Sequence, residues 1–180
     1  MPAPTACAIL HKPGLPRFLN NAMMAQNVFE IDVAPDVIAE LAPIALETRK
    51  MEERSARFSL SNGVRLFNER PQNWRSDICW LSHADEASFT WFESLYRRLA
   101  LGPLVAPYVP HDRAVVLYAG SFVTRRRCEA LDMHADWQTF DNLAFTLMLP
   151  LTSNGEALGM TYETIRGERR EHVYQPGKGL

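Results

Sequence analysis

The sequence has few cysteines, and none of them stands in a pattern that binds metal or forms a redox pair. Cys7, Cys79 and Cys128 are odd in number and form no C-x-x-C motif. A framework of disulfides is therefore not expected, and a reducing compartment fits the chain better. We predict a cytoplasmic protein.

Long apolar runs and an excess of one charge are also missing. No apolar stretch approaches the ~20 residues of a membrane-spanning helix. The proline-containing N-terminus, with Pro2, Pro4 and Pro13, lacks the ordered regions of a signal peptide. The net charge of -2 gives no reason to expect broad affinity for nucleic acid or for an anionic membrane. Neither is expected as a partner.

What remains is an ordinary globular composition. Hydrophobic residues make up 47% of the chain and charged residues 22%, which places it among folded domains rather than disordered or fibrous chains. A length of 180 residues suits one domain with a sizeable core. The sequence therefore predicts a single domain over residues 1–180.

Residues 1–112 are predicted to be a mainly helical N-terminal region. The alternation within Val28–Val33 predicts one half-buried strand. Pro35 opens a helical pattern in which Pro43 predicts a kink or a restart. Asp85 is expected to cap a second helix, in which aromatic and leucine side chains recur at helical spacing: Phe89, Phe92, Tyr96 and Leu99.

Residues 113–180 have the pattern of β-strands. We expect strands that end at Tyr118, that span 121–124, and that form the hairpin of 158–165 with 169–174 around a turn at Arg166-Gly167-Glu168. The nearly continuous apolar run from Leu143 to Leu151 predicts a strand buried on both faces. Helices followed by clustered strands indicate an α+β fold with a sandwich or barrel core.

One tripeptide in the second half has the chemistry of a metal site. In an extended chain, residues i and i+2 point the same way, so His134 and Asp136 present an imidazole and a carboxylate to one point. Two histidines and one carboxylate form the facial triad of non-haem Fe(II) oxygenases. The pair is therefore a candidate for two of the three protein ligands.

The pattern H-x-D is not specific by itself, because His83-Ala84-Asp85 repeats it. That copy precedes an expected helix, where Asp85 already has a capping role. A polar strand end without a metal remains open as the alternative for His134 and Asp136 as well.

The wider context carries a resemblance. Residues 113–180 resemble the double-stranded β-helix, or jelly-roll, core of the Fe(II)/2-oxoglutarate-dependent oxygenases, near the prolyl-hydroxylase-like and phytanoyl-hydroxylase-like branches. The matching features are a strand ending in Tyr118, the His134-Ala135-Asp136 motif, the apolar strand after it, and the segment Tyr174–Leu180, which is similar to the tyrosine-proline-glycine segment of the family.

The resemblance implies a hydroxylase that uses Fe(II), 2-oxoglutarate and O2 on a small molecule or on an amino-acid or peptide side chain. It places Tyr118 near 2-oxoglutarate, although a tyrosine is also an ordinary sheet residue. Thr146 lies on the other expected lining strand. Trp137 is a candidate wall of the substrate pocket or a packing residue, and Arg127 is a candidate anchor for an anionic substrate or a solvated loop residue.

The same resemblance implies parts that are not found. Family members carry a second histidine and then an arginine or lysine beyond the proline-glycine segment, whereas this chain ends at Leu180. His172 lies before that segment, on the wrong strand to match. A β-helix core needs about eight strands, so the core is expected to be incomplete and the chain to belong to a longer protein.

Two other readings of the sequence stay open. One is a non-catalytic β-sandwich that binds or scaffolds and keeps a vestigial metal site. The other is a cupin-like metalloprotein that holds a different divalent metal and does not use 2-oxoglutarate. Iron uptake and its dependence on 2-oxoglutarate separate the three.

Overall fold

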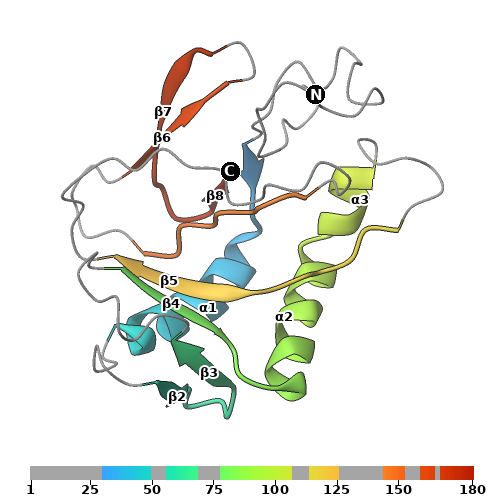
Figure 1. Ribbon diagram of the computed structural model, residues 1–180, viewed down its shortest axis with the longest axis vertical. Helices are drawn as coiled ribbons and strands as arrows, with labels where there is room; N and C mark the ends of the chain where they lie inside the picture. The colour runs from blue at the N-terminus through green and yellow to red at the C-terminus, as the bar shows by residue number, and fades with distance from the viewer. Residues whose placement is uncertain are drawn as a thin grey trace. The chain divides into compact units, whose positions relative to one another are not determined.

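A computed structural model describes residues 30–49, 56–68, 78–106, 114–125, 144–152, 159–164 and 167–180. The fold is α+β and its sheets are antiparallel (Figure 1). The described strands form sheets of two and four strands, and these do not close into a barrel. The backbone contacts divide the chain into two compact units: Met1–Ile38, Pro103–Val115 and Met133–Leu180 in the first, and Ala39–Gly102 and Val116–Asp132 in the second.

Helix α1, Pro35–Thr48, contains the boundary between the units. Proline suits the first helical position, because its fixed φ matches the helix and its missing N–H would be unsatisfied there anyway. The buried residues Val37, Leu41 and Thr48 recur at helical spacing. The helix continues through Pro43, where the sequence predicted a kink or a restart.

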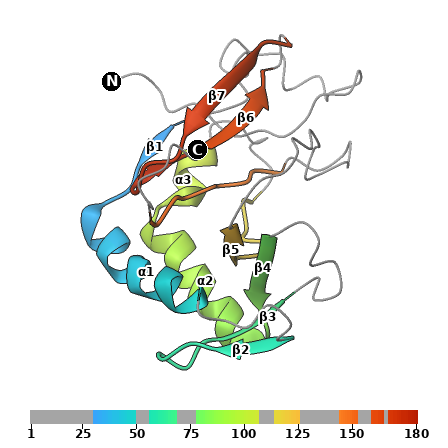
Figure 2. The same cartoon turned by 90° about the vertical axis from the view of Figure 1, so that its left-hand side faces the viewer.

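The second unit contains a four-stranded sheet in the order β2-β3-β4-β5, with β2 at Arg57–Ser59, β3 at Arg65–Asn68, β4 at Ile78–His83 and β5 at Ser121–Arg125 (Figure 2). Each pair is antiparallel, and the register places Phe67 opposite Ser82 and Trp80 opposite Val123. Because side chains alternate across a strand, this register fixes which residues share each face.

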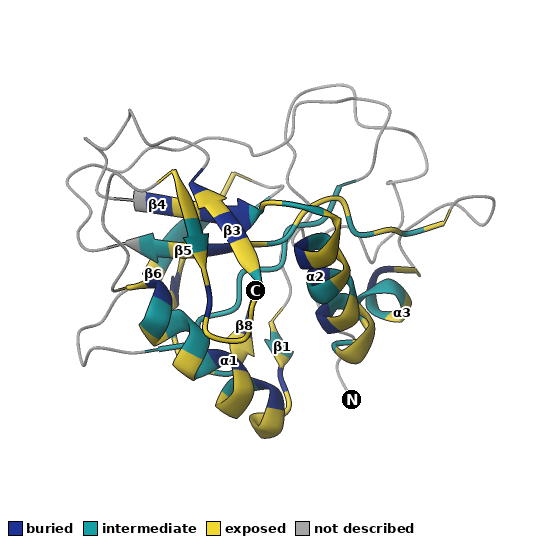
Figure 3. Cartoon of the chain, turned by 90° about the horizontal axis from the view of Figure 1, so that it is seen from below, coloured by how far each residue is buried: buried dark blue, intermediate teal, exposed yellow. Residues whose placement is uncertain are grey.

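Helix α2, Glu86–Arg98, packs on one face of this sheet. Phe92 and Leu95 are its buried apolar residues, and buried and exposed positions alternate around the helix (Figure 3). The ring of Phe92 lies 5.7 Å from that of Phe122 on β5. Leu66 and Leu81 are fully buried on the neighbouring strands. The short helix α3, Leu101–Val105, follows α2.

The first unit is assembled from both ends of the chain. Strand β1, Ile31–Asp32, pairs with β8, Lys178–Gly179, and the backbone of Leu180 exchanges two hydrogen bonds of 3.0 Å with that of Met148. Strands β6, Gly159–Glu163, and β7, Arg169–Val173, form a hairpin. The predicted hairpin, the short strand near residue 31 and the turn at Gly167, whose φ is +77°, are confirmed.

Two of the expected strands differ from the structure. Residues 114–120 form no strand, so the strand expected to end at Tyr118 is absent, and β5 begins at Ser121. Residues 144–152 are all half-buried, and Phe145 alone among them forms a β-bridge. The prediction of a strand buried on both faces is therefore wrong for these residues. Strands β2 and β4 were not predicted.

None of the helices within the described ranges is long and apolar enough to cross a membrane.

Candidate functional site

Most of the predicted site residues lie outside the residues that the structure describes. These are His134, Asp136, Trp137 and Arg127. Their roles therefore stay predictions from the sequence. Within the described ranges, no three His, Cys, Asp or Glu side chains are close enough together to hold a metal ion.

Thr146 and Tyr118 are described, each in a different unit. Thr146 is half-buried in the extended segment 144–152, two residues before the point where Met148 pairs with Leu180. Tyr118 precedes β5, and 75% of its side chain is exposed. Because the structure does not describe His134 and Asp136, the predicted role of each residue near the metal stays a prediction.

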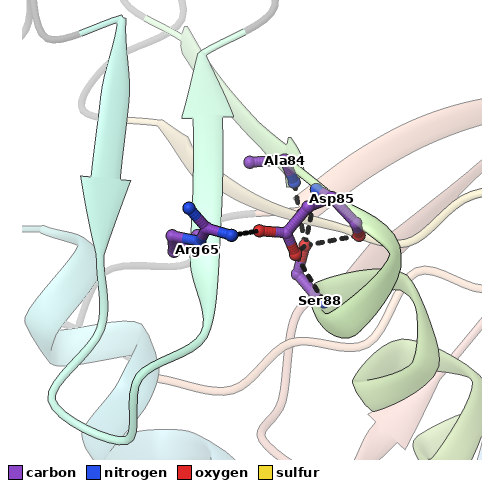
Figure 4. Close-up of polar contacts among 4 residues, drawn as sticks. All are labelled: Arg65, Ala84, Asp85 and Ser88. Carbon is purple, nitrogen blue, oxygen red and sulfur yellow. Dashed lines mark hydrogen bonds and ion pairs between the residues drawn. The ribbon is translucent and has the colours of Figure 1, made fainter.

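The second H-x-D motif lies where β4 meets α2, and its aspartate is fully engaged (Figure 4). Asp85 accepts a hydrogen bond from the backbone N–H of Ser88 at 2.9 Å, and the Ser88 hydroxyl accepts one from the backbone N–H of Asp85 at 3.0 Å. Arg65 of β3 forms an ion pair with the same carboxylate. These contacts hold the pKa of Asp85 below its usual value, first through the backbone N–H of Ser88, then through its hydroxyl and through Arg65.

The imidazole of His83 packs edge-on against Phe89, with ring centroids 5.1 Å apart. Its Nδ1 is buried without a hydrogen-bond partner. The predicted capping role of Asp85 is confirmed by the capping box. A carboxylate that already holds a helix N-terminus and an arginine has little capacity left for a metal, so this copy of the motif has a structural role.

A different histidine has a polar partner that the sequence did not indicate. His172 of β7 is only 7% exposed, and its Nδ1 lies 3.2 Å from a carboxylate oxygen of Glu30. Its Nε2 is buried without a hydrogen-bond partner. The pairing joins residues 142 positions apart in the chain, so no local pattern could have revealed it.

Comparison of the chain with protein-family models, with characterised proteins and with solved structures finds no match to any of them. The candidate site therefore depends on the residues of this chain alone.

Proposed function

We propose that this chain carries part of the active site of an Fe(II)- and 2-oxoglutarate-dependent dioxygenase that hydroxylates a small molecule or an amino-acid or peptide side chain. The observation that carries the proposal is the sequence context of His134-Ala135-Asp136, which precedes the apolar segment 143–151 and the segment Tyr174–Leu180. Imidazole and carboxylate are ligands that suit non-haem Fe(II).

The pairing in the first unit supports a jelly-roll core. Met148 pairs with Leu180 outside the hairpin of β6 and β7, so the two pairings are nested around the turn at Gly167. Jelly rolls are built from antiparallel strands connected in this folded-over way, with strands distant in sequence lying side by side. A jelly-roll core is thus our proposal for residues 113–180.

The proposed division of roles follows from chemistry. His134 and Asp136 would hold the metal, and Fe(II) with 2-oxoglutarate and O2 would supply a two-electron oxidation, in which one oxygen atom ends in succinate, released with carbon dioxide, and the other in the hydroxyl group of the product. Tyr118 and Thr146 contact 2-oxoglutarate through hydroxyl groups. Trp137 shields the substrate from water, and Arg127 attracts an anionic group on it.

Metal binding by single variants tests the proposal. His134→Ala and Asp136→Ala are each expected to remove Fe(II) binding, measured by anaerobic titration, and to stop the succinate production that depends on 2-oxoglutarate. His83→Ala is the matched control, because it changes the other H-x-D motif, and it should bind iron like the unaltered chain.

Two outcomes contradict the proposal. Iron uptake that survives in both His134→Ala and Asp136→Ala places the metal elsewhere. An unaltered chain that takes up no Fe(II) above background, with or without 2-oxoglutarate, indicates a binding or scaffolding protein instead of an oxygenase.

A further inference from the structure

Among the described residues of the second unit, helix packing on the sheet is found on one face only. Helix α2 packs on the face formed by Leu66, Leu81 and Phe122. By strand alternation and register, the opposite face carries eight residues whose side chains are described, which we call the open face: Arg57, Ser59, Arg65, Phe67, Trp80, Ser82, Ser121 and Val123. Four of them lie in one row across all four strands, in the order Arg57, Phe67, Ser82, Ser121.

The large apolar side chains of the open face are exposed. Phe67 is 37% exposed, Trp80 36% and Val123 47%. Trp80 lies directly opposite Val123, and Phe67 is diagonal to Trp80, a spacing of roughly 7–8 Å that aromatic side chains can bridge. The three therefore form one apolar patch with two aromatic rings.

The two described charged side chains of the open face, Arg57 and Arg65, are both positive. The four strands contain no aspartate or glutamate. Arg57 is exposed directly opposite Phe67 and has no ion-pair partner among the described residues, whereas Arg65 is engaged by Asp85. An exposed guanidinium beside the ring of Phe67, with Trp80 beyond it, complements a flat, apolar ligand that bears a negative charge.

We propose that the open face binds a planar aromatic anion, with the ring system against Phe67 and Trp80 and the anionic group beside Arg57. This inference stands on the geometry of the second unit alone. Ser121 of the same row is exposed and small enough to let a flat ligand approach the sheet, whereas Ser82 is buried.

Two dyes of matched shape test the inference on the whole, iron-free chain. The anion is 1-anilinonaphthalene-8-sulfonate, and its neutral counterpart is N-phenyl-1-naphthylamine. Phe67→Ala with Trp80→Ala is expected to weaken both dyes by about tenfold, because the double variant removes both aromatic rings against which the dye would stack. Val173→Ala, which removes an exposed apolar side chain from β7, is the control and should change neither affinity.

The charge is tested separately. Arg57→Gln is expected to weaken the sulfonate by about threefold, in the range of an exposed ion pair, and to leave the neutral dye unchanged. Arg97→Gln, which removes an exposed arginine on α2, is the control. Near-ultraviolet circular dichroism shows whether each variant keeps its native packing, and Val123→Ser replaces the double variant if that one does not fold.

Absence of dye binding to the unaltered chain overturns the inference, as does equal binding to Val173→Ala and to the variants of the open face. Because no iron is used, this result is independent of the titration of His134→Ala. Dye binding without iron uptake leaves the binding site standing and removes the oxygenase. Iron uptake without dye binding supports the oxygenase and overturns the binding site on the open face.

Discussion

At the N-terminus of α2, one serine hydroxyl makes most of the polar contacts. Ser88 is almost fully buried, and its hydroxyl accepts a hydrogen bond from the backbone N–H of Asp85. The backbone N–H of Ala84 donates both to this hydroxyl and to the carbonyl of Arg65. Ser88→Ala therefore leaves the N–H of Asp85 without its partner. We expect a loss of about 1–3 kcal/mol in the free energy of unfolding, measured with urea. Ser94→Ala, on the exposed side of the helix, should change it by less than about 0.5 kcal/mol.

Asp85 makes stability depend on pH at this same place. Its pKa is lowered in the folded chain from the ordinary 3.8, first by the backbone N–H of Ser88. A group with a lowered folded pKa stabilises the fold above its unfolded pKa, and this contribution is lost as the pH falls through the folded pKa. Asp85→Asn keeps an N-cap residue but has no charge to titrate.

The stability difference between the unaltered chain and Asp85→Asn should therefore be larger at pH 7 than at pH 3. Urea unfolding at the two pH values measures it. The same difference at both would show that the carboxylate charge does not stabilise the N-terminus of α2.

Strand β4 provides a comparison between the two faces of one sheet. Leu81 is fully buried on the face covered by α2, and Val123 lies on the open face of the neighbouring strand. Leu81→Ala should cost about 2–5 kcal/mol of unfolding free energy, because it removes buried methyl groups and leaves a cavity. Val123→Ala should cost less than about 1 kcal/mol. Similar losses in chemical denaturation would mean that both faces are packed.

Elements with a local signal could be predicted from the sequence. The start of α2 was predicted from Asp85, and the hairpin was predicted from the turn at Gly167. Strand β4 was missed because Cys79 and Leu81 alternate with the apolar Ile78 and Trp80, so its pattern has no polar face. The continuous apolar run at 143–151 predicted more burial than residues 144–152 have, since composition alone does not reveal how many neighbours a segment has.

The candidate site could be predicted only as far as local geometry extends. The alternation of an extended chain pairs His134 with Asp136, and it pairs His83 with Asp85 equally well. The two motifs were separated by the residues after them, which have a strand pattern in one case and a helical pattern in the other, and the capping box confirms the second assignment. The contact of His172 with Glu30 depends on tertiary structure and has no local signal.

The first unit depends on three segments that are far apart in the chain. The backbone of β8 pairs with β1, and Leu180 pairs with Met148, so residues near 31, 148 and 180 share one set of antiparallel contacts. The N–H of Val33 also donates to the carbonyl of Gly177 at 2.9 Å. Such non-local pairing closes long loops, so its contacts must offset the entropy lost in closing them.

Gly179 is the position at which this arrangement can be tested. A Cβ there would lie 2.8 Å from Cγ1 of Ile31 and 3.0 Å from Cδ1 of Leu147, so Gly179→Val forces both neighbours apart. We expect the amide protons of Met148 and Leu180 to exchange at least about tenfold faster, the change that a loss of about 1.4 kcal/mol in opening free energy produces. Hydrogen exchange followed by NMR measures this directly.

The control is Lys178→Val, which places the same β-branched side chain one residue earlier, where the position is exposed. It removes the ion pair with Asp32, an exposed contact of small energetic value. Slow exchange at Met148 and Leu180 should persist in this variant. If Gly179→Val also leaves exchange at these two amides slow, the three segments do not pack as closely as the register of β1 and β8 requires, and the support that their nested pairing gives to a jelly-roll core is lost.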